Sequence, residues 1–333
     1  MNSSGNTIAV SVGRLLKPYD LVFEQETIDP SAVAADEILV ETAFSAISPG
    51  TELAAYAGLP PLRPGPVYPR LVGYCNCGKV LAAGAKAGNL RVGDRVLTGA
   101  SHRSHYRIAA SSAVRVPDGL ESQEAATAYL FHLGYAALQR GKAQAGHRIA
   151  VIGLGVLGLA TVALARVAGA RVTAVSERET ALGMASTFGA DVAVGKEGAA
   201  SHADHDIVVL TSNTWDDWKL ALRMARRGGT IVVIGFPGRG QEAPAFNPLD
   251  SQYFYDKQLA LLAAGQVVEA DVSADVAEFT LNRNMTYLLD LMAHRRLPAA
   301  EFARHIRQAS DLAAAYEDLL HRRDDALTYV LRW

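Results

Sequence analysis

The sequence has few cysteines, little net charge and no long uninterrupted apolar run, and each shortage excludes a class of protein. Its two cysteines, Cys75 and Cys77, are too few for a disulfide framework and too close in the chain for an ordinary bridge between elements. The formal net charge is −2 with Lys and Arg scattered, so no basic face follows a phosphate backbone and nucleic acid is not expected as a partner. The longest apolar stretch, residues 149–168, contains glycines and Arg166, which predicts no membrane span.

The composition instead fits a globular protein with a large core. The chain has 333 residues, of which 50% are hydrophobic, and this predicts two domains. The N-terminus, Met-Asn-Ser-Ser-Gly-Asn, lacks a basic region followed by an apolar core. No secretory signal is therefore predicted, and a cytoplasmic location is expected.

Strand-like and helical segments alternate through the middle of the chain, which predicts a parallel, doubly wound α/β sheet. The expected strands are His147–Ile152, Val172–Val175, Ile207–Leu210, Thr230–Ile234 and Leu259–Ala263. The expected helices are Gln123–Arg140, Glu179–Phe188 and Asp216–Ala225.

The first third of the chain has short strands separated by Gly and Pro clusters, which predicts a small, mostly antiparallel, barrel-like domain. After about residue 267 the pattern becomes helical and ends on a strand-like Leu327–Trp333. We therefore expect one domain from residues 1–121 and 267–333 and a second from residues 122–266. The expected N-terminal strands are Ile38–Thr42, Gly78–Leu81, Asp94–Leu97 and Tyr106–Ala109.

A G-x-G-x-x-G motif formed by Gly153, Gly155 and Gly158 directly follows the strand His147–Ile152 and precedes a helical segment. In this strand-to-helix context Gly153 permits a tight turn, Gly155 lets the backbone approach a diphosphate, and Gly158 lets the helix pack closely on the strand. The N-terminus of the helix, with Val156 and Leu157, then faces the anion. The motif predicts a dinucleotide-binding site.

The residues after the next strand favour NADPH (NADP+) over NADH. An NAD site usually places Asp or Glu at this point to bind both ribose hydroxyls, whereas this chain has Ser176. Serine does not repel a 2′-phosphate, and Arg178 can bind one through charge-assisted hydrogen bonds. Glu177 leaves an alternative open, because it takes the ribose position if the strand ends one residue later.

Several further motifs occur together with the glycine loop. They are Ser48-Pro-Gly-Thr-Glu52, Gly73-Tyr-Cys-Asn-Cys-Gly78, Val92-Gly-Asp-Arg-Val96, Val116-Pro-Asp-Gly-Leu120 and Asp311-Leu-Ala-Ala-Ala-Tyr316. With these motifs nearly the whole chain resembles the medium-chain dehydrogenase/reductase superfamily. The resemblance implies a GroES-like barrel domain followed by a Rossmann domain, and a C-terminal segment that returns to the first domain.

The departures from that superfamily indicate its zinc-independent branch. Where zinc-dependent members carry metal ligands, this chain has Pro49, then Tyr74 and Cys75, and then Tyr129. The four-cysteine structural lobe is also missing. Zinc prefers thiolate, imidazole or carboxylate, so no metal is expected. Without a Lewis acid, hydride addition to a polarised C=C or activated C=O is favoured over alcohol oxidation.

The resemblance also implies catalytic candidates. Thr51 matches a hydroxyl that family members place beside the ribose and the substrate oxygen, and Tyr74 and Tyr129 replace ligands and can donate a hydrogen bond to a developing oxyanion. Alternatively, both tyrosines only fill the space of the lost metal. Glu52 is expected behind the cofactor, or else as a solvated acid, and His132 is either a catalytic group or a core histidine.

Other cofactor contacts are expected at the carboxyl ends of later strands, where such sheets bind ligands. These are Thr211 with Ser212, and Gly235 with Phe236. The last strand, 259–263, resembles the sheet edge through which family members form dimers, so a homodimer is expected.

Some conspicuous residues are not expected to act in the site. His102 and His105 are expected at a cleft edge or on the surface, and His202 and His205 are expected in solvent. Trp215 and Trp218 are expected to pack a helix on the sheet, and both cysteines are expected to be buried and inert.

Taken together, the sequence predicts a zinc-independent NADPH-dependent reductase. The proline-rich loop 59–66 suggests a bulky apolar substrate, and zinc-free relatives include natural-product tailoring enzymes, such as those of reductive cyclisation in polycyclic tetramate macrolactam pathways. One alternative is an NAD(P)-dependent dehydrogenase of a hydroxyethyl or cyclitol group. Another is a crystallin-like protein that binds NADPH without catalysis.

Overall fold

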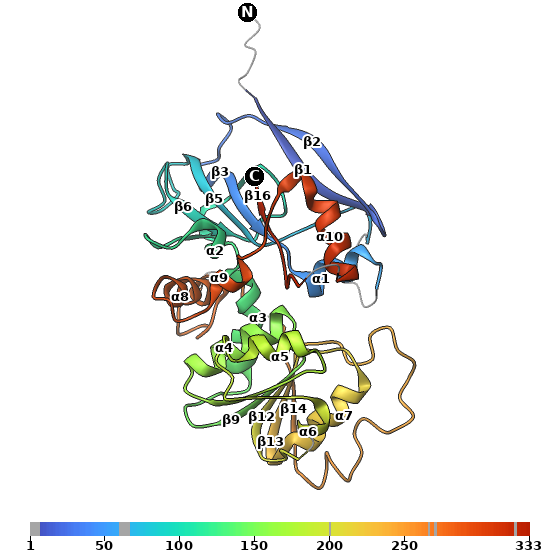
Figure 1. The fold of residues 1–333 in the computed structure, drawn as a ribbon. Helices are drawn as coiled ribbons and strands as arrows, with labels where there is room; N and C mark the ends of the chain where they lie inside the picture. The colour runs from blue at the N-terminus through green and yellow to red at the C-terminus, as the bar shows by residue number, and fades with distance from the viewer. Residues whose placement is uncertain (1–6, 60–66, 200, 266, 270–271, 323–324) are drawn as a thin grey trace, which may run out of the picture. The chain divides into compact units, whose positions relative to one another are not determined.

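The computed structural model describes residues 7–59, 67–199, 201–265, 267–269, 272–322 and 325–333. The proline-rich loop at 60–66 therefore lies outside the described residues. The chain divides into two compact units, coloured along the chain in Figure 1. Unit 1 comprises Met1–Tyr129, Val268–Arg295 and Ala299–Trp333, and unit 2 comprises Leu130–Val267 and Arg296–Pro298.

Unit 1 is built on a seven-stranded sheet with the order β15-β16-β3-β5-β6-β8, in which β7 also pairs with β3. All of its pairings are antiparallel except β15 with β16. A smaller antiparallel sheet has the order β2-β1-β4. The strands are β1 (Ile8–Lys17), β2 (Asp20–Ile28), β3 (Glu37–Ala46), β4 (Arg70–Leu71), β5 (Asn76–Ala83), β6 (Arg95–Thr98), β7 (His105–Ala109), β8 (Ala113–Arg115), β15 (Ile306–Gln308) and β16 (Val330–Arg332).

Two apolar clusters form the core of unit 1, and α-helices contribute side chains to one of them. In one cluster Tyr56 of α1 and Tyr316 of α10 meet edge to face, with ring centroids 5.4 Å apart. In the other, Val40, Val80 and Tyr106 pack between the strands. The helices of unit 1 are α1 (Pro49–Tyr56), α2 (Ser122–Ala125), α8 (Leu281–Ala293), α9 (Ala299–Phe302) and α10 (Leu312–His321).

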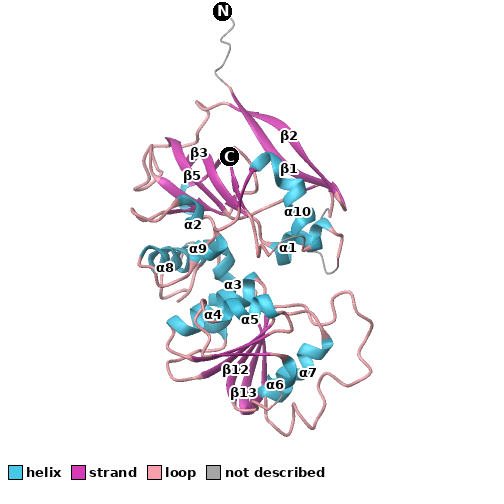
Figure 2. Cartoon of the chain, viewed as in Figure 1, coloured by secondary structure: helices cyan, strands magenta, loops and turns pink. Residues whose placement is uncertain are grey.

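Unit 2 is a six-stranded parallel sheet with the order β11-β10-β9-β12-β13-β14. The chain moves outward from β9 to β10 and later from β12 to β13 in the opposite direction, so right-handed crossovers place α4 and α7 on opposite faces (Figure 2). The strands are β9 (Arg148–Ile152), β10 (Arg171–Val175), β11 (Val192–Val194), β12 (His205–Leu210), β13 (Ala225–Val233) and β14 (Ala260–Ala263). The helices are α3 (Ala128–Arg140, which begins in unit 1), α4 (Val156–Val167), α5 (Glu179–Ala185), α6 (Lys196–Ala199) and α7 (Trp215–Met224).

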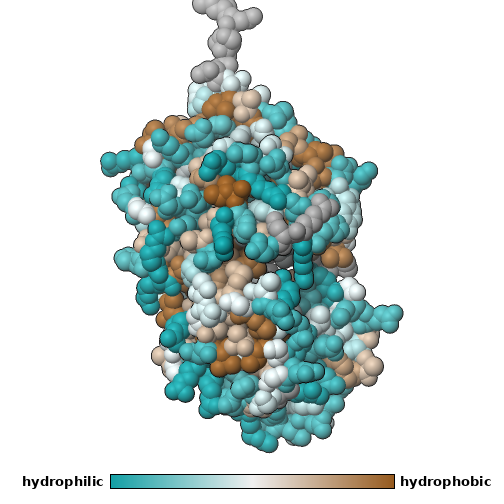
Figure 3. Space-filling model, in the orientation of Figure 1, coloured by the Kyte–Doolittle hydropathy of each residue, from teal (hydrophilic) through white to brown (hydrophobic). Residues whose placement is uncertain are grey.

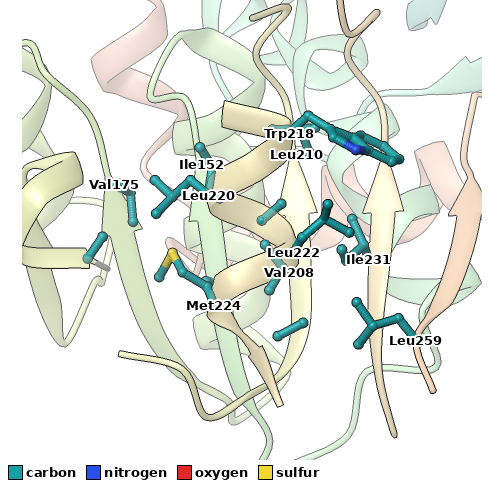
Figure 4. Close-up of a cluster of buried hydrophobic side chains, with 14 residues drawn as sticks. Ile152, Val175, Val208, Leu210, Trp218, Leu220, Leu222, Met224, Ile231 and Leu259 are labelled. Carbon is teal, nitrogen blue, oxygen red and sulfur yellow. The ribbon is translucent and has the colours of Figure 1, made fainter. Parts of the chain in front are cut away.

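The core of unit 2 lies between this sheet and α7, as Figure 4 shows. Trp218, Leu222 and Met224 of α7 pack on the buried β-branched and leucine side chains of the strands, and Trp215 packs partly against them. The expected role of the two tryptophans is therefore confirmed. The antiparallel sheets of unit 1 and the doubly wound parallel sheet of unit 2 confirm the predicted fold class.

Several element boundaries differ from the sequence-based expectations. The predicted helix Gln123–Arg140 is two helices, α2 and α3, and Thr127 lies between them with its Oγ1 donating to the carbonyl oxygen of Glu124 at 2.7 Å. That side-chain bond competes with continued helix. The strands β1, β2 and β11 were not predicted, and β13 begins at Ala225 rather than Thr230.

Hydrophilic side chains cover most of the face shown in Figure 3, with hydrophobic ones between them. No helix among the described residues is long and apolar enough to cross a membrane.

Candidate functional site

The glycine motif forms the turn between β9 and α4 in unit 2. Gly153 has φ 94°, in the left-handed region that favours glycine. A Cβ on Gly158 would lie 2.9 Å from the carbonyl carbon of Gly153, nearer still to its oxygen, and 3.2 Å from Thr211 Oγ1. These two glycines therefore allow the helix to sit directly on the turn.

Gly155 differs from its two neighbours in the motif. It is the N-cap of α4 with φ −81° and ψ −168°, it is exposed, and a Cβ there would meet no atom within 4 Å. The conformation does not require glycine, and the space beside it is open. The first N–H groups of the helix, from Val156, Leu157 and Gly158, have no acceptor within the helix. This open, N–H-lined turn fits the diphosphate of a dinucleotide.

Thr211 and Ser212, at the end of β12, border the same turn. Thr211 Oγ1 donates to the carbonyl oxygens of Gly153, at 2.7 Å, and Ile152, at 3.1 Å, so this side chain braces the turn. Ser212 Oγ is buried and has no hydrogen-bond partner among the described residues. A buried hydroxyl without a partner is costly, and a bound cofactor would supply one.

The end of β10 carries the groups that bear on cofactor choice. Ser176 is buried, and its Oγ accepts from the N–H of Arg178 at 3.1 Å. The Arg178 guanidinium turns back over the glycine turn, where Nη2 donates to the carbonyl oxygen of Leu154 at 2.9 Å. Glu177 Oε1 instead accepts from the backbone N–H of Lys196 at 2.7 Å. The carboxylate is therefore held at the start of α6, and the guanidinium at the glycine turn.

The segment after β13 also lies at the carboxyl end of the sheet. A Cβ on Gly235 would overlap the carbonyl group of Ser212, so the two strand ends approach closely there. The N–H of Phe236 donates to Asn213 Oδ1 at 2.8 Å, and the Phe236 side chain is 48% exposed.

In unit 1, a group of hydroxyls lies at the start of α1. The phenol oxygen of Tyr74 is 2.5 Å from Ser48 Oγ and 3.5 Å from Thr51 Oγ1. Tyr129 packs edge to face on Tyr74, with centroids 6.2 Å apart. Burial raises the pKa of both phenols, so both stay protonated at neutral pH. Thr51 is exposed, so the group borders the surface of the unit.

A buried network lies behind these hydroxyls and was missed from the sequence. Glu52, 4% exposed, accepts from the backbone N–H of Ser48 at 2.7 Å through Oε1. Its Oε2 contacts His102 Nε2 at 2.9 Å and accepts from the phenol of Tyr316. Glu52 thus joins the N-cap of α1 to the loop between β6 and β7 and to α10. Its alternative interpretation as a solvated acid is wrong.

His102 is likewise not at a cleft edge or on the surface. It is fully buried, with Nδ1 2.8 Å from Ser45 Oγ and Nε2 facing Glu52. His205 is not in solvent either, because it begins β12 and its Nε2 lies 3.0 Å from Thr173 Oγ1. His202 is exposed and His105 is half-buried, as expected. Motifs alone gave no signal that the buried carboxylate of Glu52 needs a buried partner.

The remaining candidates have clear environments. His132 lies on α3 in unit 2, is 8% exposed, and burial lowers its pKa to about 4, so its ring is neutral at pH 7. Cys75 and Cys77 are free and fully buried. Their expected burial is confirmed, and burial raises the pKa of both thiols, which favours the thiol over the reactive thiolate.

Zinc-dependent members of the superfamily that this chain resembles carry metal ligands at certain positions, and the side chains at these positions here do not fit zinc. Pro49 offers no donor, the phenols of Tyr74 and Tyr129 stay protonated, and the thiol of Cys75 is buried with a raised pKa. Both ring nitrogens of nearby His102 are already engaged. Within the described ranges, no three His, Cys, Asp or Glu residues are grouped to hold a metal ion.

Comparison with known proteins shows which proteins share this fold. Residues 156–282 match the family model described as zinc-binding dehydrogenase. L-idonate 5-dehydrogenase from Escherichia coli K-12 superposes with a TM-score of 0.82 at 15% identity, covering 98% of this chain and 99% of its own. The chain has the fold of the medium-chain dehydrogenases and reductases. No curated protein matches its sequence.

Other solved structures share this medium-chain fold. Alcohol dehydrogenase from Thermus sp. has a TM-score of 0.76 at 21% identity, covering 97% of this chain and 99% of its own. A candidate zinc-binding dehydrogenase from Sinorhizobium meliloti, bound to NADP, has a TM-score of 0.76 at 18% identity, covering 98% of this chain and all of its own (100%). The likeness extends through both units of this chain.

Proposed function

We propose that this chain is an NADPH-dependent oxidoreductase that reduces a polarised C=C or activated C=O without zinc. The observation that carries the proposal is the protonated Tyr74 phenol, held 2.5 Å from Ser48 Oγ beside an exposed Thr51. Support for the cofactor comes from the open turn at Gly155 and the unpartnered Ser212 Oγ. The fold is one in which other proteins bind NADP or NADH.

The preference for NADPH rests on Ser176, Arg178 and Glu177. Arg178 already extends over the glycine turn, and Ser176 adds no negative charge beside it. Glu177, the residue that would favour NADH, is held by the N–H of Lys196. A 2′-phosphate at the end of β10 would therefore meet a guanidinium and a hydroxyl.

Tyr74 is suited to binding an oxygen on which negative charge develops. Hydroxyl hydrogens can rotate, so Ser48 can donate to the phenol oxygen and leave the Tyr74 hydrogen for the substrate. Thr51 Oγ1, 3.5 Å from the phenol oxygen of Tyr74, is near enough to donate a second hydrogen bond to the same substrate oxygen. Because burial raises its pKa, the Tyr74 phenol stays protonated at neutral pH, so it can donate a hydrogen bond to a developing oxyanion and is not available as a base to remove a proton from an alcohol.

The net reaction balances without a metal. The glycine turn at Gly155 and the Ser212 hydroxyl would hold NADPH, which would supply the hydride for the electrophilic carbon and be released as NADP+. The π electron pair of the substrate moves onto its oxygen, where Tyr74 and Thr51 donate hydrogen bonds, and a solvent proton completes the reduced product. In this proposal Tyr129 packs against Tyr74 and fixes the ring, and His132, which is neutral at pH 7, carries no proton to the substrate.

Tyr74→Phe tests the proposal, with Tyr129→Phe as the matched control. A panel of enones, aldehydes and ketones is assayed with NADPH and NADH, and polyols with NADP+ and NAD+. We expect Tyr74→Phe to lower kcat for reduction by ten- to a thousandfold and to leave NADPH affinity unchanged. Equal kcat in Tyr74→Phe and wild type would overturn the role of Tyr74.

The second candidate function is alcohol or polyol oxidation. It is favoured by the likeness of the fold to L-idonate 5-dehydrogenase and to 2R,3R-butanediol dehydrogenase from Bacillus subtilis. Turnover of polyols with NAD(P)+, and none of carbonyls or enones with NADPH, would favour it. NADPH binding without turnover of either class would favour a role without catalysis.

A further inference from the structure

Arg239 is a partly buried cation without a counter-charge at the ligand-binding edge of the unit 2 sheet. It follows β13, and its Nε is buried with no hydrogen-bond partner among the described residues. No carboxylate in the described part of the chain forms an ion pair with it. Its guanidinium carbon lies 4.1 Å from the ring centroid of the exposed Phe236.

The loop that carries Arg239 is held in place by backbone hydrogen bonds. Asn213 binds it twice, since its Oδ1 accepts from the N–H of Phe236 at 2.8 Å and its carbonyl oxygen accepts from Gly238 at 2.7 Å. The N–H of Arg239 donates to the carbonyl oxygen of Phe236 at 2.9 Å. Gly238 has φ 82° and lies against the indole of Trp215, where no side chain would fit. The backbone from which the Arg239 side chain extends is therefore held by the fold, and the Phe236 ring lies against the guanidinium.

Partial burial of this guanidinium is unfavourable as it stands. Desolvation lowers the pKa of Arg239, yet an arginine stays protonated in proteins. A desolvated charge with no opposite charge is costly, and an anion that bound there would offset the cost. Three other arginines of unit 2 pair with carboxylates, namely Arg148 with Asp204, Arg166 with Asp191 and Arg226 with Asp206.

We propose that Arg239, backed by the Phe236 ring, binds an oxyanion of phosphate or carboxylate type carried by a ligand of the oxidoreductase. This rests on the proposed function. The site is separate from the Ser176 and Arg178 pair, because β9 and β12 lie between β10 and β13 in the sheet. The anion is either the cofactor diphosphate or an acidic group of the substrate, and guanidinium geometry suits both.

The test compares Arg239→Gln with Arg227→Gln, which removes the same charge from an exposed arginine on β13. Arg239→Lys keeps the charge without the planar fork. In the binding arm, calorimetry measures the affinity of each variant for NADPH, ADP, inorganic pyrophosphate and cinnamate. In the turnover arm, NADPH oxidation is followed with benzylideneacetone and with its para-carboxylate.

We expect Arg239→Gln to lower either the affinity for one class of ligand or kcat/KM for one substrate by tenfold or more. Arg239→Lys should give an intermediate value, and Arg227→Gln should match the wild type. A loss for NADPH, ADP and pyrophosphate assigns the anion to the cofactor. A loss for cinnamate, or in kcat/KM for the carboxylated enone alone, assigns it to the substrate.

Two results would overturn the inference: Arg239→Gln behaving like Arg227→Gln in both arms, or no binding of any of the four ligands by the wild-type protein. Failure of the proposed function looks different, because the wild type would then reduce neither enone while the binding arm still reports on Arg239.

Discussion

The second and third glycines of the motif, Gly155 and Gly158, predict different consequences for an added methyl group. Gly155→Ala places its Cβ in open space, and the φ of −81° suits any residue. As an N-cap, alanine is weaker than glycine by a few tenths of a kcal/mol to about 1 kcal/mol. We therefore expect nearly normal stability, but much weaker NADPH binding, because the methyl group occupies the space proposed for the diphosphate.

Gly158→Ala is expected to destabilise unit 2, because the added methyl group has no room. Its Cβ would lie 2.9 Å from the carbonyl carbon of Gly153 and 3.2 Å from Thr211 Oγ1, both on the backbone turn or bonded to it. Neither neighbour is a flexible chain end, so α4 must shift. Overpacking of this kind costs about 1 to 3 kcal/mol, and cofactor binding is lost together with stability.

The assay uses Trp215 and Trp218, which both belong to unit 2 and report its unfolding in urea. NADPH affinity is measured separately by fluorescence titration at a temperature where each variant is folded. Normal NADPH affinity in Gly155→Ala would refute the proposed diphosphate site. A Gly158→Ala variant as stable as wild type would refute the close-packing argument while leaving the site untested by that variant alone.

Three further predictions follow from other contacts. Arg178→Gln should weaken the binding of NADPH by about 1 to 3 kcal/mol more than the binding of NADH in direct titrations. An equal loss of affinity for both cofactors would contradict the proposed contact of Arg178 with the 2′-phosphate. Glu52→Gln should lower the free energy of unfolding by about 1 to 3 kcal/mol, because one amide cannot accept from all of the donors that the buried carboxylate now serves; unchanged urea midpoints would contradict this. His132, with its pKa lowered to about 4 against roughly 6.5 when unfolded, is protonated more readily in the unfolded chain, so its contribution is present above about pH 6.5 and is lost as pH falls towards 4. The wild type should lose about 2 kcal/mol more than His132→Gln between pH 7.5 and 5 in urea unfolding, and parallel losses would contradict the burial argument.

The sequence predicted best where local pattern and tertiary structure agree. The glycine spacing after an apolar strand predicted the turn at Gly153, and the alternation of segments predicted the parallel sheet, because buried parallel strands are continuous apolar runs. Strand β11 was missed since Val192–Val194 is three residues long and lies at the sheet edge, where its side chains are exposed or half-buried. The break between α2 and α3 falls at Thr127, whose side chain donates to the carbonyl oxygen of Glu124, and no periodicity reveals such a bond.

The candidate site was less predictable because its polar partners come from distant parts of the chain. Glu52 was singled out by its motif, but its partners His102 and Tyr316 are 50 and 264 residues away in sequence. Spacing rules describe neighbours along a helix or a strand and say nothing about such pairs. His102 was assigned to the surface because its neighbours are Ser and Arg, although the fold buries its ring completely.

The proposed absence of zinc and the buried network explain one another. A buried carboxylate needs donors or a cation, since an unpaired charge in the interior is costly. If Tyr74 and Tyr129 stand where metal ligands would be, no cation is available near Glu52, and donors must replace it. The N–H of Ser48, the ring of His102 and the phenol of Tyr316 provide them. Returning Tyr74 to His would therefore not restore a metal site by itself, because the carboxylate is already committed to these three donors.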